Sequence, residues 1–271
     1  MRLNKNNFTD NSLIVLKDEL WLKRQKHAGR CVANILKECG NLIKATTPNL
    51  SLKDLEQLTY LYTRNMDCTP TFLNYKGFPG AACISVNKQL VHGIPTDYIL
   101  QDGDIISVDL GATFEGAIAD AARTWIYGNP KSPEHVRLLK VGREALDNGV
   151  KAVKVGGRLG EIGYAIHNTV KNTGFGNIIN YGGHFLSYNK PHDEPFVSNK
   201  ADKNEGIRLR SGCTLAIEPM VILGGDTITK VADDGWTVLT VDLGCHFENT
   251  VCIMNDVVHL ITEIPNENYL G

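Results

Sequence analysis

Four carboxylates lie within or beside apolar stretches of the 271-residue chain, and this feature constrains the fold most. They are Asp109, Asp120, Glu218 and Glu248. Burial of a charged carboxylate is costly unless a cation or a hydrogen-bonding partner compensates for it. A single acid in a strand is usually exposed at the edge of a sheet, but four such acids indicate a buried site that binds cations.

Two of these acids are expected to face each other across a β-hairpin. A tight turn around Phe114 and Glu115 would place Asp109 directly opposite Asp120 on one face of the two strands. Like charges in that position repel, and a metal ion is the usual reason for their proximity. The hairpin therefore predicts a metal site between its strands.

A histidine supplies the remaining ligand chemistry. His184 ends the segment Tyr181-Gly182-Gly183-His184, in which glycines allow close backbone approach to a ligand. His246 would share a strand face with Glu248 if the strand is regular, but we do not include it in the predicted site. One histidine and four acids suit a pair of divalent first-row ions better than a single structural zinc. Such a pair can make a shared water nucleophilic at neutral pH, which is typical of metal-assisted hydrolysis.

Hydrophobic periodicity predicts an α+β fold with an antiparallel sheet. Helices are expected over 16–43, from Ser51 through Leu61, over 132–153 and over 158–172. Strands are expected over 104–110, 117–126, 214–223, 236–241 and 247–254. We see no linker between independent domains, so residues 1–271 are predicted to form a single domain with a helical lead-in over about residues 1–70.

A weak internal repeat suggests two related halves that face a shared site. In each half a histidine is followed three residues later by proline, and a strand then begins after a glycine and reaches its acid six residues later. The two sets are His92, Gly103 and Asp109, and His192, Gly212 and Glu218. The Val-Asp-Leu-Gly sequence also occurs twice, at 108–111 and 241–244, and we interpret this as coincidence.

Composition excludes several other classes of protein. The chain is 42% hydrophobic with a formal net charge of -2, and no basic run indicates a nucleic-acid groove. The polar first seven residues do not resemble a secretory signal, and no apolar run is long enough to cross a bilayer. The seven cysteines form no Cys-x-x-Cys pair, which predicts reduced thiols and a cytoplasmic location.

The order and spacing of these motifs, from about residue 16 to 261, resemble those of type I methionine aminopeptidases. The resemblance rests on residues 92–95, 102–109, 120–124, 183–184, 217–220, 234–237 and 247–250. It implies the pita-bread fold, with two αβ halves around a pseudo-two-fold axis. It also implies removal of the initiator methionine from nascent proteins when the second residue is small.

The resemblance implies a role for each site residue. The metal ligands would be Asp109, Asp120, His184, Glu218 and Glu248, with Asp120 and Glu248 bridging two ions of cobalt, manganese, iron or zinc. Glu218 would also act as general base. His192 would polarise the scissile carbonyl, and His92 would steer the departing amide nitrogen.

The methionine pocket of the family is lined by aromatic and sulfur side chains, which suit a polarizable thioether. The matching positions here are Phe72, Tyr75, Phe78, Cys83 and Trp236.

The sequence departs from the usual family pattern near this pocket. Phe185 stands in place of glycine, Pro191 stands in place of an aromatic residue, and the stretch 184–192 is one residue longer than expected. We therefore predict that a loop over 185–191 reshapes one pocket wall. Phe72 and Asn249 stand where cysteine and histidine are common in the family.

The segment lengths favour a minimal, bacterial-style enzyme. No cysteine-rich extension precedes the first helix, and the spacing from Glu218 to Glu248 leaves no space for the helical insertion of type II enzymes. The expected partners are the N-termini of nascent polypeptides, with transient ribosome association, no membrane contact and a monomeric state. The alternatives are an Xaa-Pro aminopeptidase or prolidase and a non-catalytic pita-bread binding protein.

Overall fold

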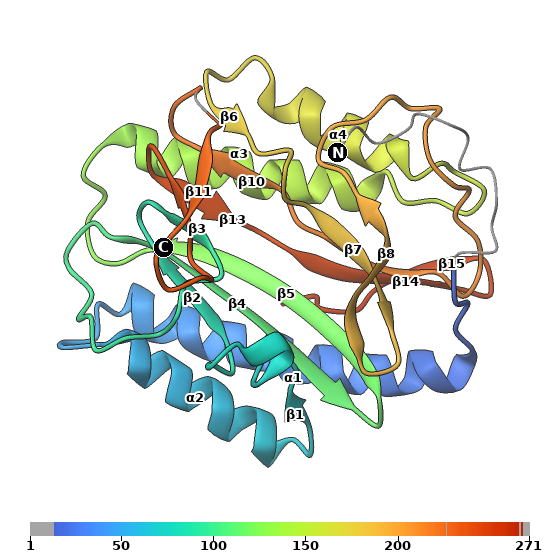
Figure 1. Cartoon of the computed structure of the whole chain (residues 1–271), viewed down its shortest axis with the longest axis horizontal. Helices are drawn as coiled ribbons and strands as arrows, with labels where there is room; N and C mark the ends of the chain where they lie inside the picture. The colour runs from blue at the N-terminus through green and yellow to red at the C-terminus, as the bar shows by residue number, and fades with distance from the viewer. Residues whose placement is uncertain (1–13, 226, 266, 268–271) are drawn as a thin grey trace.

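Helices flank the strands on two sides of the molecule (Figure 1). The structure is a computed structural model that describes residues 14–225, 227–265 and 267. The polar first seven residues, in which we found no secretory signal, lie outside the described part. The helices are α1 (Glu19–Lys44), α2 (Leu52–Asn65), α3 (Pro133–Lys151) and α4 (Gly160–Val170). Helices α1 and α2 lie on one side and α3 and α4 on the other. The bounds of the helices confirm each of the four predicted helices within a few residues.

Local sequence signals explain where these helices begin. Asp18 accepts a hydrogen bond from the backbone of Trp21 and caps α1. Ser51 and Asp54 form a reciprocal capping box at the start of α2. Proline in the first turn of α3 needs no hydrogen-bond partner for its nitrogen. The buried face of α1, which includes Trp21, packs along β4 (Ile105–Phe114) and β5 (Ala117–Ile126).

The β4–β5 hairpin differs from the predicted register by two residues. Asp109 pairs with Ala122 and Asp120 pairs with Gly111, so the two acids are diagonal neighbours and not directly opposite. The turn is centred on Glu115 and Gly116, whose φ angles of 46° and 82° are both left-handed, as a two-residue hairpin turn requires. Because a two-residue shift preserves the side-chain face, both acids still point to the same side.

The second half of the chain contains two strand breaks that lie side by side. Strand β9 (Thr214–Ile217) is followed by β10 (Met220–Ile222), and β13 (Gly244–His246) is followed by β14 (Asn249–Met254). Strand β9 pairs with β14, whereas β10 pairs with β13 in a different sheet. The predicted continuous strands over 214–223 and 247–254 are therefore wrong at the positions of Glu218 and Glu248, where the chain passes from one sheet to the next.

The predicted loop over 185–191 is a β-hairpin. Strands β7 (Gly183–Ser187) and β8 (Lys190–Val197) pair with irregular register, and β7 joins β9 through Phe185 and Leu215. Phe185 is only 2% exposed and packs into the core cluster that includes Leu215. The phenylalanine that replaces glycine at this position therefore anchors the hairpin in the core.

The remaining strands complete the four antiparallel sheets found among the described residues. They are β1 (Thr69–Pro70), β2 (Cys83–Val86), β3 (Gln89–Val91), β6 (Gly176–Asn177), β11 (Thr229–Val231), β12 (Val238–Thr240) and β15 (Val257–Leu260). The largest sheet has the order β15-β14-β9-β7-β8, and β4 lies between β5 and β2 in another. Strand β12 is shorter than the predicted strand over 236–241. The α+β class with antiparallel sheets is confirmed.

The burial of the cysteines agrees with their expected state. All seven are buried and free of disulfides. Among the described residues, we find no helix whose length and hydropathy would allow it to span a bilayer.

Candidate metal centre and substrate pocket

Each residue that we predicted for the site lines one pocket between the two halves of the molecule. Asp109 and Asp120 project from β4 and β5, and His184 projects from β7. Glu218 and Glu248 lie at the two strand breaks. All five of these side chains come from residues that are at most 9% exposed. The sequence therefore predicted the residues that meet in this pocket, although it did not predict every strand that carries them.

The acids and the histidine form overlapping groups in which candidate ligand atoms lie within 4.8 Å of one another. One group is Asp109, Asp120 and Glu248, and another is His184, Glu218 and Glu248. Nε2 of His184 lies 3.5 Å from Oε1 of Glu218 and 3.9 Å from Oδ2 of Asp120. Two groups that share a carboxylate can hold two neighbouring cations.

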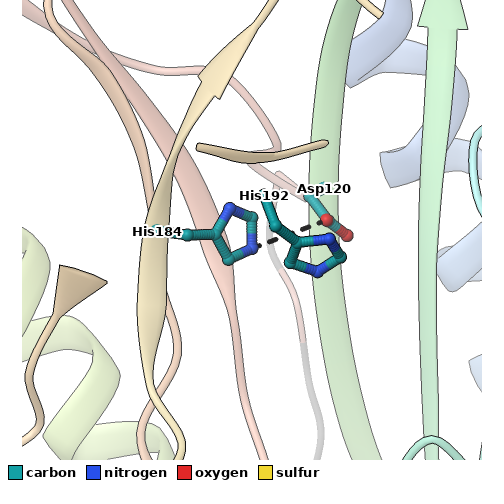
Figure 2. Close-up of side chains that lie close together, drawn as sticks. All are labelled: Asp120, His184 and His192. Carbon is teal, nitrogen blue, oxygen red and sulfur yellow. Dashed lines mark ion pairs between the residues drawn. The ribbon is translucent and has the colours of Figure 1, made fainter. Parts of the chain in front are cut away.

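His192 also approaches these ligands. Its side chain from β8 points toward His184 and Asp120, which project from β7 and β5 (Figure 2). Its ring centroid lies 4.4 Å from that of His184, and a third group of candidate ligands contains Asp120, His184 and His192. Unlike the five buried residues, His192 is exposed, which places it at the mouth of the pocket.

Burial changes the protonation of the clustered acids. Burial, together with the charge of Asp120, raises the pKa of Asp109 well above its usual range. Burial and neighbouring carboxylates raise the pKa of Glu218 and of Glu248 in the same way. Burial raises the pKa of Asp120 to about 7, although a backbone hydrogen bond opposes this change. These shifts reflect acids that lack a compensating positive charge.

His184 has the protonation state that a metal ligand needs. Burial lowers the pKa of His184 to about 4, so its imidazole is neutral at pH 7. Its Nδ1 lies 3.2 Å from the carbonyl oxygen of Phe185, which leaves Nε2 directed at the acids. A neutral imidazole whose other nitrogen contacts a carbonyl is a common ligand arrangement.

Several buried oxygens have no hydrogen-bond partner among the described residues. They include Oδ1 of Asp109, Oδ1 of Asp120 and Oε1 of Glu248. Unpaired buried carboxylate oxygens are costly, and cation coordination would satisfy them. The donor set of carboxylates and one imidazole fits divalent first-row metals.

Backbone contacts hold the acidic strands against each other. The Oγ1 atom of Thr250 accepts a hydrogen bond from the backbone nitrogen of Asp120 at 2.9 Å and donates one to its backbone carbonyl oxygen at 2.8 Å. The nitrogen of Glu248 donates to the oxygen of Ala122 at 2.9 Å. Nδ2 of Asn199 donates to the backbone carbonyl oxygen of Glu218 at 3.1 Å. Hydrogen bonds from neighbouring segments thus hold the backbone that carries the acids.

Aromatic residues form the wall beside the acids. Phe72, Phe78 and Cys83 make a small buried cluster against which Trp236 packs. The ring of Tyr75 stacks on His192 at 5.3 Å, and Phe78 meets Trp236 edge to face at 5.2 Å. The five residues predicted for a thioether pocket therefore all line the same apolar wall.

His92 lines the pocket in a strained backbone conformation. It follows β3 with a φ angle of 58°, in the left-handed region that side chains other than glycine rarely adopt. Its ring meets that of Tyr181 edge to face at 6.3 Å. Strain of this kind is concentrated at functional sites, which agrees with the position of His92 in the pocket.

Sequence reasoning did not include His246, which lines the same pocket. Its Nε2 lies 3.3 Å from Oε2 of Glu218, and the residue is only 2% exposed. We expected His246 to share a strand face with Glu248 if the strand was regular. Strand β13 instead ends at His246, and the strand is interrupted before β14 begins at Asn249. Met220, two residues after Glu218, pairs with His246 in β13, and this pairing brings the histidine to Glu218.

Known proteins resemble this chain over most of its length. Residues 23–255 match the model of metallopeptidase family M24. "Methionine aminopeptidase 1" of Bacillus subtilis is 38% identical over 254 residues, which cover 93% of this chain and 100% of that protein. The methionine aminopeptidase of Mycoplasma capricolum is 37% identical, with coverage of 93% and 99%.

Solved structures agree with these sequence matches. The crystal structure of methionine aminopeptidase from Thermotoga maritima superposes with a TM-score of 0.87 at 36% identity, covering 92% of this chain and 99% of that one. Prolidase from Pyrococcus furiosus superposes with a TM-score of 0.71 at 18% identity, and the match covers only 66% of that protein. The second comparison shows the shared fold alone, and the predicted pita-bread architecture is confirmed.

Proposed function

Since the chain belongs to the methionine aminopeptidases of metallopeptidase family M24, we propose that it removes an N-terminal methionine from polypeptides whose second residue is small. The observation that carries this proposal is the joining of two candidate ligand groups through Glu248 beside an apolar, aromatic pocket. The acids and imidazole supply a site for cations, and the wall supplies a site for a thioether.

We assign metal binding to Asp109, Asp120, His184, Glu218 and Glu248. Membership of Glu248 in both groups supports a bridging role, and the same role is assigned to Asp120. Manganese, iron, cobalt and zinc all suit this donor set, and availability selects among them. Divalent ions held by these residues would lower the pKa of a coordinated water and would stabilise negative charge on the scissile carbonyl.

The side chains around the ligands carry out the proton transfer and the orientation. Glu218 accepts the proton of the attacking water, and its carboxylate faces the pocket beside His184 and His246. His192, at the mouth of the pocket, donates a hydrogen bond to the scissile carbonyl. His92, which also lines the pocket, orients the departing amide nitrogen.

The walls of the pocket account for the proposed substrate. The methionine side chain is enclosed by the aromatic and sulfur side chains of Phe72, Tyr75, Phe78, Cys83 and Trp236. His192, which stacks on Tyr75, is next to the scissile bond in this proposal. A large second residue would displace His192, so a small second residue is favoured. The proposed substrates are the N-termini of nascent polypeptides in the cytoplasm. A transient contact with the ribosome and a monomeric, single-domain enzyme complete the proposal.

The coverage of the relatives favours this substrate over the alternatives. The chain spans 99% of the Thermotoga aminopeptidase but 66% of the Pyrococcus prolidase, so it matches the first over its whole length. A non-catalytic member of the fold would not need a buried cluster of acids, because that cluster is costly without a cation.

Peptide hydrolysis tests this proposal. Metal-stripped protein is assayed with Met-Ala-Ser, Met-Leu-Ser and an Xaa-Pro peptide, with manganese, cobalt or iron then added back. We expect methionine release from Met-Ala-Ser alone, and only with metal. Cleavage of the Xaa-Pro peptide would contradict the substrate assignment, and metal binding without any cleavage would support the non-catalytic alternative.

A further inference from the structure

We infer that Glu267 is a positioning residue that neutralises Arg123 and so keeps the carboxylate of Glu248 available to metal. Glu267 lies beyond the last strand, β15, which ends at Leu260. The inference rests on the proposed metal centre, and it adds a residue that is not itself a proposed ligand.

Arg123 lies directly behind the strand break that carries Glu248. It is 1% exposed in β5, and its Nη1 donates to the carbonyl oxygen of Glu248 at 2.6 Å and to that of Ala122 at 2.9 Å. Its Nη2 donates to Oδ1 of Asn249 at 2.9 Å. One guanidinium therefore fixes the backbone at Glu248 relative to β5, the strand that carries Asp120.

A buried guanidinium needs a counter-charge, and Glu267 provides it. Oε1 of Glu267 lies 2.6 Å from Nε of Arg123, and its Oε2 lies 2.5 Å from Nη1 of Arg143. The side chain of Glu267 is 8% exposed, so this arrangement is shielded from solvent. Among the described residues, Glu267 forms the ion pair with Arg123, whereas Arg143 has a second acidic partner in Asp147 at 3.0 Å.

The chain that leads to Glu267 is held beside the same break. Oγ1 of Thr262 donates to Oδ1 of Asn249 at 2.9 Å and accepts from the nitrogen of Thr250 at 3.0 Å. Thr262 is fully buried, and Ile264 packs against the core cluster that includes α1 and β5 side chains. These contacts deliver Glu267 to Arg123 and show that the segment is part of the scaffold behind the acids.

Loss of Glu267 would change the charge that Arg123 presents to the metal centre. Because Nη1 of Arg123 lies 2.6 Å from the backbone carbonyl oxygen of Glu248, the charge of the guanidinium acts at short range on this residue. Without Glu267, the uncompensated guanidinium would draw the Glu248 carboxylate toward itself, and that carboxylate would then bind cations less tightly. The role is therefore one of metal affinity as well as stability.

The test is manganese binding by the metal-stripped full-length protein, measured by isothermal titration calorimetry. Glu267→Ala is expected to weaken binding on the order of tenfold, as loss of an outer partner of a metal site does. Glu267→Gln, which keeps the shape of the side chain, should weaken binding in the same direction and decides the test if the alanine variant does not fold. Glu263→Ala, at an exposed position in the same segment, is the control and should match the wild type.

A second readout separates this role from a purely structural one. The aminopeptidase activity of Glu267→Gln is assayed at a temperature well below the melting temperature of the variant. This activity should recover as the manganese concentration is raised. A variant that is merely destabilised would not regain activity in this way. Unchanged manganese affinity in Glu267→Gln, or an equal loss in Glu263→Ala, would overturn the inference. A wild-type protein that binds no divalent cation would instead contradict the proposed metal centre itself.

Discussion

The two halves of the molecule present their acids to the pocket in different ways. Asp109 and Asp120 lie within the long, continuous strands of the β4–β5 hairpin, and the ordinary pleat aims both at one face. Glu218 and Glu248 lie at adjacent breaks where the chain changes sheet. Regular structure suffices to position the first pair, whereas the second pair depends on two interruptions of regular structure that must stay in contact.

Removal of a shared acid from either half should have the largest effect. Asp120→Ala and Glu248→Ala are each expected to lower methionine release by at least about a hundredfold, more than loss of an outer partner usually does. Circular dichroism should show an intact fold, because each change removes a buried like charge. Asp97→Ala, at a highly exposed site, is the control. Near-normal turnover in either variant would contradict the two-metal mechanism.

Metal removal should expose the cost of burying Asp120 as a pH dependence of stability. The pKa of Asp120 is raised to about 7 in the folded state, so the metal-free fold binds protons more tightly than the unfolded chain. Its stabilising contribution is complete below about pH 4, the usual pKa of an aspartate, and is lost as the pH rises through about 7. The melting temperature of chelated protein should therefore fall from pH 5 to pH 8.

Two additions sharpen the pH test. Saturating manganese should flatten the pH profile, and Asp120→Asn should weaken it in chelated protein. A melting temperature of chelated protein that rises over this pH range would contradict the assigned pKa shifts.

Substitution of Gly183 tests how tightly the second half is packed. A Cβ atom there would lie 2.1 Å from the carbonyl oxygen of Ala216 in β9, next to the break at Glu218. Gly183→Ala should lower the free energy of unfolding by about 3 kcal/mol, within the range for overpacked cores, and should also weaken manganese binding. Gly225→Ala, where a Cβ meets nothing within 4 Å, is the matched control for denaturant melts. Unaltered metal affinity in Gly183→Ala would show that the break tolerates movement.

Substitution of Gly116 should produce the smallest effect. Its φ angle of 82° in the β4–β5 turn is left-handed, so alanine there should cost about 1–2 kcal/mol of unfolding free energy. A Cβ there would meet the side chains of Tyr188, at 2.9 Å, and Asn189 in the β7–β8 turn. Neither residue is a proposed ligand, so manganese affinity should be unchanged. A loss of affinity comparable to that of Gly183→Ala would remove the distinction between the two halves.

How far the site could be predicted follows the same division. Alternation placed Asp109 and Asp120 on one face, and this survived an error of two residues in the register because the side-chain period is two. No local pattern announces that a strand will stop and change sheets, so the breaks at Glu218 and Glu248 were missed. The contact of His246 with Glu218 was missed for the same reason, because it depends on the pairing of β10 with β13 beside the breaks.

The 185–191 hairpin was missed for a different physical reason. Its residues include proline and asparagine, which favour loops locally. Burial of Phe185 against Leu215 of β9 nevertheless fixes the segment as a strand. A contact between residues distant in the sequence overrides local preference here, and a single sequence does not display such a contact.

The dispersion of the five proposed ligands along the chain has a consequence for biosynthesis. A zinc finger takes its ligands from one short stretch, and metal capture can drive its folding. Here the last proposed ligand along the chain, Glu248, directly precedes β14 and is available only when most of the chain has been synthesised. Cation uptake would then follow folding as its final event, and an incomplete nascent chain would carry no active centre.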